Sequence, residues 1–151
     1  MEIKEPYATQ EEFNKRVIRY RDIPLVELVP NGNVHILSSE RMTVIFVTLA
    51  PNAVVPVHHH EPEQIMIIVE GECDQIIGGK LYHLKEGNVV CYASNEEHGT
   101  YVSDKGLRTI EFFAPIRQEY MAKLEAVKKS LSQDDIAYHQ ISGRQRHRLL
   151  S

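Results

Sequence analysis

The sequence predicts an all-β fold, an antiparallel sandwich or barrel, with one helix added near the C-terminal end. After Pro24, short runs rich in β-branched and aromatic residues follow one another about every 8 to 12 residues, with turn residues between them. Near Ile116 the apolar residues change to helical spacing. The chain has 151 residues, which is enough for one domain with its own core.

Composition narrows the classes of function. The formal net charge of -4 argues against a nucleic-acid-binding protein, which would carry a basic surface. No apolar run approaches the roughly 18 residues that a membrane-spanning helix needs, and the polar N-terminus does not resemble a secretory signal. Cys73 and Cys91 are expected to be reduced thiols. We therefore expect a cytoplasmic protein without nucleic-acid or membrane partners.

Three segments are expected: an N-terminal segment 1–23, a β-barrel domain 24–116, and a C-terminal helix and tail 117–151. The polar N-terminal segment contains a possible short helix around Glu11 to Arg19. The strand runs of the barrel domain are LVELV, NVHIL, TVIFVTL, VVPVH, QIMIIV, CDQII, LYHL, NVVCY, TYV and LRTIEFF. Residues typical of turns separate these runs at 30–33, 50–52, 70–72, 78–79, 85–87 and 94–95.

The C-terminal helix is predicted from the apolar residues that follow Arg117. Their spacing of three and four places them on one helix face, and Lys128 and Lys129 suit its C-terminal end. From Ser132 the sequence is polar, and we expect a solvated or partner-packed tail there. The residues of the apolar face are Tyr120, Met121, Leu124, Val127 and Leu131.

Histidines precede the QIMIIV run and indicate a metal site. In a strand, residues of equal parity share a face, so His58 and His60 point to one side and His59 to the other. If the alternation continues, Gln64 falls on the histidine side. His98, which opens a later strand, is the candidate fourth ligand. Side chains of these types in a facial arrangement suit a divalent transition metal.

The spacing of these residues resembles the two motifs of the cupins. The first motif is Gly, five residues, His-x-His, three or four residues, Glu, six residues, Gly; here it reads Asn52, His58-His59-His60, Gln64 and Gly71. The second is Gly, five residues, Pro-x-Gly, two residues, His; here it reads Gly87, 93–95 and His98. The similarity covers about residues 24–116.

The resemblance implies a double-stranded β-helix, or jelly-roll barrel, that holds one divalent transition metal (Zn, Ni, Fe or Mn) through His58, His60, Gln64 and His98. Gln64 stands where the family has glutamate, and a neutral amide leaves the dipositive charge of the ion uncancelled. Glu63 is an alternative ligand if the link before the strand is irregular, although strand parity points its side chain away.

A second patch resembles the pectin-degradation type of cupin, which converts unsaturated uronates to linear keto sugars. It comprises Glu111, Phe113, Pro115, Arg117 and the pair Glu119-Tyr120. The resemblance implies that Glu111 moves a proton and that Arg117 holds a substrate carboxylate, although that group generally has aspartate at the position of Glu111. The structural alternatives are a rim carboxylate for Glu111 and an ion pair with the C-terminal helix for Arg117.

The resemblance therefore implies a metal-dependent isomerase or lyase acting on a small sugar acid. Polyketide cyclase or dioxygenase chemistry at the same metal site is an alternative, and so is a non-catalytic cupin that binds a small ligand. Cupins of this size commonly pair, so a homodimer is expected. The residues expected to line a substrate pocket are Met66, Tyr92, Tyr101 and Phe113.

Overall fold

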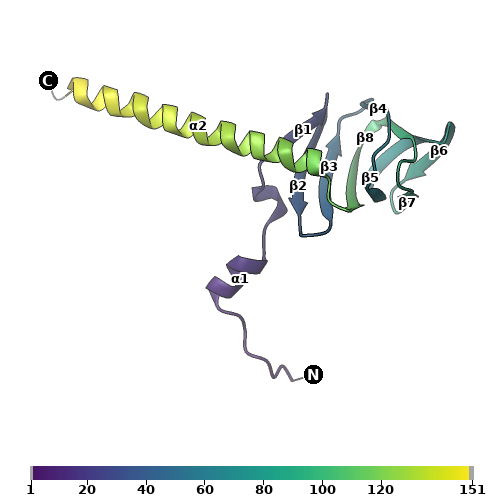
Figure 1. The fold of residues 1–151 in the computed structure, drawn as a ribbon, viewed down its shortest axis with the longest axis horizontal. Helices are drawn as coiled ribbons and strands as arrows, with labels where there is room; N and C mark the ends of the chain where they lie inside the picture. The colour runs from purple at the N-terminus through teal and green to yellow at the C-terminus, as the bar shows by residue number, and fades with distance from the viewer. Residues whose placement is uncertain (1, 150–151) are drawn as a thin grey trace.

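The computed structural model describes the backbone of residues 2–149 and the side chains of residues 2–133. It confirms the predicted all-β jelly-roll barrel with an added C-terminal helix (Figure 1). The elements are α1 (Gln10–Arg16), a 3-10 turn η1 (Tyr20–Asp22), β1 (Val26–Val29), β2 (Gly32–Ser38), β3 (Thr43–Leu49), β4 (Val54–His58), β5 (Glu63–Ile77), β6 (Lys80–Lys85), β7 (Val89–Tyr92), β8 (His98–Ala114) and α2 (Gln118–Leu149).

The strands form one antiparallel sheet in which β5 and β8 pair along almost their whole length. The first half of β5 and the second half of β8 lie between β7 and β3. The other two halves lie between β6 and β4. The two long strands therefore belong to both halves of the rolled sheet, and the barrel interior lies between those halves.

The region around Gly71 is a register shift within β5, not the turn that its sequence predicts. Gly71 has a φ of 88° and lies beside Gly106 of β8, whose φ is 74°. Two glycines let the backbones approach closely while both strands bend. Consequently β5 and β8 each run on where the sequence suggests two separate strands.

The shift also changes which residues face the interior. On β5, Gln64, Met66 and Ile68 are buried before the shift. After it, the buried residues are Cys73 and Gln75, which have odd numbers. The same change occurs on β8, where the buried side chains belong to even-numbered residues from His98 to Val102 and to odd-numbered residues from Leu107 to Phe113. Both halves of each strand thereby contribute side chains to one interior.

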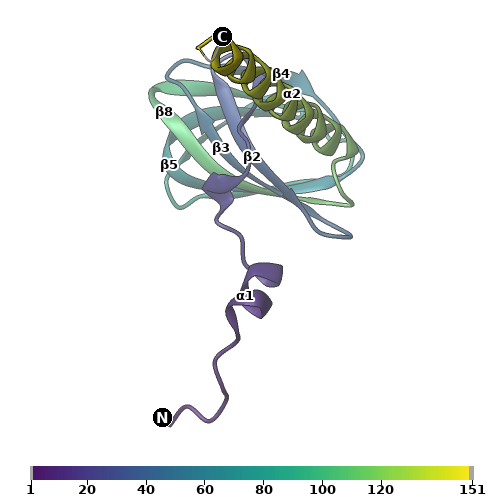
Figure 2. The ribbon, with the colours of Figure 1, turned by 90° about the vertical axis from the view of Figure 1, so that its left-hand side faces the viewer.

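Helix α2 packs on the barrel through its first turns only. Leu124 is buried, and Tyr120, Met121 and Val127 are partly buried against the core. Beyond them the helix extends away from the barrel, whereas the N-terminal segment with α1 leaves in another direction (Figures 1 and 2). The backbone of the polar stretch after Ser132 continues the helix to Leu149, whereas the expected solvation or partner packing of its side chains from residue 134 lies outside the described residues.

None of the described helices combines the length and the apolar character required to cross a membrane. Helix α1 confirms the predicted short N-terminal helix. It begins with a capping box between Thr9 and Glu12, and none of its residues is buried.

We predict that Gly71→Ala destabilises the protein far more than Gly78→Ala. Both glycines have positive φ, which costs a residue with a Cβ about 1–2 kcal/mol. A Cβ at Gly71 would also overlap the backbone carbonyl of Gly106, whereas at Gly78 no atom lies within 4 Å. Backbone overlap adds about 1–3 kcal/mol or more. Urea unfolding of the two variants measures the difference, and equal losses would contradict the close approach of β5 and β8.

Candidate metal centre

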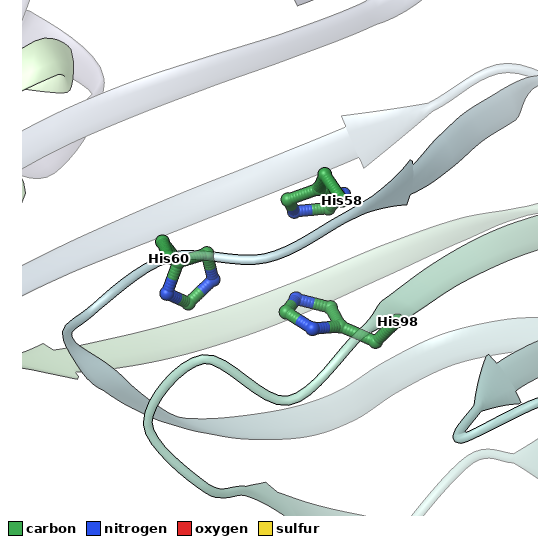
Figure 3. Close-up of side chains that lie close together, drawn as sticks. All are labelled: His58, His60 and His98. Carbon is green, nitrogen blue, oxygen red and sulfur yellow. The ribbon is translucent and has the colours of Figure 1, made fainter.

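The three histidines come from two paired strands and the link between β4 and β5. His58 ends β4 and lies directly opposite His98, which begins β8. His60 follows in the link. The potential ligand atoms of the three side chains lie within 4.8 Å of one another (Figure 3). The predicted convergence of His58, His60 and His98 is therefore present, while His59 is exposed between the first two.

Each of the three rings is oriented by a backbone carbonyl. Nδ1 of His58 lies 2.8 Å from the carbonyl oxygen of Pro56, Nδ1 of His60 lies 2.7 Å from that of Pro62, and Nδ1 of His98 lies 2.7 Å from that of Glu96. A carbonyl only accepts, so Nδ1 carries the proton in each neutral ring. The lone pair of each Nε2 is then available to a metal ion.

Gln64 completes the set with its amide oxygen. Its Nε2 donates to Oε2 of Glu111 at 2.7 Å, which turns Oε1 toward the histidines, 3.2 Å from Nε2 of His60. In the neutral tautomer of His60, its Nε2 and Oε1 of Gln64 are both acceptors and cannot hydrogen-bond to each other. A metal ion bound by both atoms would make their short separation favourable. Nε2 of His98 is likewise buried with no hydrogen-bond partner among the described residues. The donor set fits a divalent ion.

Glu63, the alternative ligand, is exposed at the start of β5. The regular alternation from Glu63 onward places Gln64 inside and Glu63 outside. The described geometry therefore supports the amide and not the neighbouring carboxylate.

Burial favours the neutral form of His60 and of His98. It is the largest cause of the lowered pKa of His98, about 4, to which the charges of His58, His60 and Arg117 also contribute. Burial is also the largest cause of the lowered pKa of His60, followed by the positive charge of Arg117. Neutral imidazole is the form that coordinates a metal, so the environment favours the ligand state near neutral pH.

Glu111 is part of the cavity wall and not the rim carboxylate of the alternative interpretation. It accepts hydrogen bonds from Gln64 and, at 2.7 Å, from Oγ1 of Thr109. Burial raises the pKa of the Glu111 carboxyl, while the bond from Thr109 and the charge of Arg117 oppose that rise. Glu111 therefore holds Gln64 in position and also presents a proton-exchanging group to the cavity.

Arg117, which the resemblance expects to hold a substrate carboxylate, is buried beside two aromatic rings, and its Nε and Nη1 have no hydrogen-bond partner among the described residues. Its side chain is 4% exposed, and its guanidinium carbon lies 4.0 Å from the ring centre of Tyr120 and 5.0 Å from that of Phe113. Nη2 contacts Glu119 at 3.2 Å, which is the predicted structural alternative. The described lining of the cavity does not include Arg117. Its charge acts on His60 and Glu111 from behind the site.

A cavity of about 80 Å³ lies inside the barrel, next to this cluster. Met66 and Tyr92 line it as predicted, whereas Phe113 is buried beside it, with its ring edge toward His60. The prediction for Tyr101 is wrong, because Tyr101 is 49% exposed on the outer face of β8. Parity counted from the inward-facing His98 places Thr100 inside and Tyr101 outside.

Three polar residues of the cavity were missed from the sequence: Gln75, Thr100 and Tyr120. The inward direction of Thr100 can be predicted from that of His98, because the two residues are two positions apart on β8. Gln75 does not follow from the parity of Gln64, since the register shift near Gly71 reverses the inward face. Tyr120 was assigned to the apolar face of the C-terminal helix and to the patch that includes Glu111, but not to a pocket; it packs against the core and also lines the cavity.

Comparison with known proteins agrees with this geometry. The cupin domain family matches residues 45–113. An RmlC-like cupin from Shewanella frigidimarina superposes with a TM-score of 0.65 at 19% identity, over 70% of this chain and 95% of its own. KdgF from a Halomonas species superposes with a TM-score of 0.62 at 20% identity, over 66% and 93%.

Oxalate decarboxylase from Bacillus subtilis superposes with a TM-score of 0.58 at 17% identity, over 65% of this chain and 29% of the decarboxylase. At these identities the likeness shows the fold alone. No curated protein sequence matches the chain significantly. Residues 45–113 of this chain therefore match the cupin domain family, and the barrel has the fold of the solved cupins.

Proposed function

We propose that this protein is a metal-dependent enzyme that acts on a small, oxygen-rich substrate. The observation that carries the proposal is the convergence of three Nδ1-anchored imidazoles and one amide oxygen beside an interior cavity. His58, His60, His98 and Gln64 would hold one divalent transition metal (Zn, Ni, Fe or Mn). When bound, such an ion acts as a Lewis acid and polarises an oxygen atom of the substrate. Its four protein ligands are neutral, so they do not reduce its charge.

Glu111 supplies the proton transfer in this proposal. Its carboxyl lines the cavity, and its pKa is raised by burial toward the range where a group both takes up and releases a proton. Gln64 and Thr109 fix its orientation through hydrogen bonds. The protein surface around the cavity is mostly apolar, which excludes bulk water from the transfer.

We propose the linearisation of unsaturated uronates as the specific reaction. The support is the resemblance of the Gln64 motif and of the Glu111 patch to pectin-degradation cupins. In this isomerisation the anomeric hydroxyl loses a proton, the bond between the ring oxygen and the anomeric carbon breaks, and a proton adds to the alkene carbon next to the new enol. Glu111 takes up the first proton and returns a proton to carbon, so the overall reaction is balanced.

The metal ligands are tested by comparing His98→Ala with His59→Ala. We expect His98→Ala to lower metal affinity by more than about tenfold, because it removes one of the converging nitrogens. His59 lies between two ligands in sequence but is exposed, so its alanine variant should retain the metal. Metal content per chain after dialysis is the measurement, with circular dichroism to confirm folding. Full metal content in His98→Ala would exclude the proposed site.

The proton-transfer role is tested with Glu111→Gln. An amide at this position keeps the size of the side chain and cannot exchange the proton, so kcat on unsaturated galacturonate should fall about 10²- to 10⁴-fold. Loss of the conjugated absorbance of this substrate is followed over time. Metal content should stay near that of the unaltered protein. A metal-loaded, unaltered protein that leaves the absorbance constant would refute the uronate reaction.

We also propose that the protein is a homodimer. Support comes from α1, which buries none of its residues, and from α2, which extends beyond the barrel (Figure 1). Exposed apolar residues of the N-terminal segment include Tyr7, Phe13 and Ile18. Sedimentation equilibrium is expected to give about twice the 17.4 kDa of one chain. Deleting residues 2–18 should weaken the association, and a monomer at micromolar concentration before the deletion would refute the proposal.

A further inference from the structure

A second polar group lies inside the barrel, on the half of β5 that follows the register shift. Gln75 is 1% exposed and pairs with Thr100 across β5 and β8. Its Nε2 donates to Oγ1 of Thr100 at 2.7 Å and lies 3.7 Å from Sγ of Cys73. Its Oε1 is buried and has no hydrogen-bond partner among the described residues.

An amide oxygen in this situation is costly. A buried acceptor without a donor destabilises a fold by about 1–3 kcal/mol, and most such groups in proteins find a partner. A methionine or leucine would fill the same interior position of β5 without that cost. The unpaired oxygen of Gln75 therefore needs an explanation outside the packing of the barrel.

The position of Gln75 in the cavity wall explains its unpaired oxygen. Gln75 and Thr100 line the same cavity as His58, His98 and Gln64. Tyr92 also lines this cavity, with its ring 4.4 Å from that of His98, and the acceptor of its hydroxyl among the described residues is the thioether of Met66, at 3.9 Å. The wall thus contains an acceptor without a donor and a donor with a weak acceptor.

The charges of the wall identify the chemistry that fits it. No lysine or arginine belongs to the described lining, so the cavity around Gln75 offers nothing to neutralise a carboxylate. Glu111, bonded to Gln64, is an acidic residue of this lining, and residues such as Val34, Ile45 and Leu107 make much of the remaining wall apolar. An uncharged hydroxyl can donate to Gln75 Oε1, whereas an anionic group is favoured only at the histidine cluster.

We propose that Gln75 selects the ligand by accepting a hydrogen bond from its hydroxyl group, and that the ligand is a small hydroxycarboxylic acid. The carboxylate of this acid lies at the histidine cluster, and its hydroxyl lies at Gln75. The inference rests on the proposed function, because it places the carboxylate at the metal ion that the proposed ligands would hold. It adds to that function a residue that determines specificity and a class of ligand.

The test measures binding and not turnover. Isothermal titration calorimetry of the zinc-loaded full-length chain compares lactate with propionate, and 3-hydroxybutyrate and 4-hydroxybutyrate with butyrate. At least one hydroxy acid should bind about tenfold more tightly than its parent acid, the effect of one good hydrogen bond to a buried acceptor. In Gln75→Met this preference should disappear. An unaltered protein with no preference in any pair would overturn the proposal.

Ile68→Val is the matched control. Ile68 is as deeply buried on the same strand, but it does not belong to the described lining of the cavity, so its variant should keep the preference. A preference that survives in Gln75→Met would come from chelation of the ion by the hydroxy acid and would overturn the role of Gln75. Gln75→Asn retracts the same amide by one methylene and should also weaken the preference for hydroxy acids. It replaces Gln75→Met in the test if the methionine variant does not fold.

Metal analysis of the same samples separates this inference from the proposed function. The hydrogen bonds of Gln75 go to Cys73 and Thr100 and not to the proposed metal ligands, so Gln75→Met should hold zinc as the unaltered protein does. An unaltered protein that binds no metal would refute the metal-dependent function. In that metal-free sample, tighter binding of a hydroxy acid than of its parent acid would still test the role of Gln75. Equal binding of the two acids there would overturn the inference as well.

Discussion

The pairing of β5 with β8 is the constraint on which the rest of the structure depends. Each strand runs through both halves of the sheet, and the two bend together where Gly71 meets Gly106. The bend reverses the inward parity of both strands, so residues that would alternate to opposite faces of a straight sheet point into one interior. Gln64 and Glu111 enter from one side of the bend, and Gln75 and Thr100 enter from the other.

The electrostatics of the interior follow from this arrangement. Burial disfavours charge on His60 and His98, and it also disfavours charge on Glu111, whose pKa it raises. Arg117 is a permanent cation near the site, and its guanidinium lies over the rings of Phe113 and Tyr120. Neutral ligands would leave the charge of a dipositive ion uncompensated, and the Glu111 carboxyl, bonded to Gln64, is the group that can balance it.

The histidine spacing was sufficient to predict much of this site. His58 and His60 share parity, and the second motif places His98 at the start of a strand, so their convergence follows from local rules and the resemblance. The turn assigned to 70–72 was wrong because Glu-Gly-Glu is typical of a turn and of a bulge alike. That error hid Gln75, whose inward direction depends on a contact with Gly106, distant in sequence. The position of Arg117 depends on the packing of α2, which parity does not describe.

Two of the three carbonyls that anchor the histidines belong to proline residues, Pro56 and Pro62. The pyrrolidine ring fixes φ at these positions, so the peptide groups that orient His58 and His60 have little freedom of their own. The orientation of these two imidazoles thus depends on short segments of main chain with limited freedom. An ion that bound here would meet two rings that are already held by the backbone beside them.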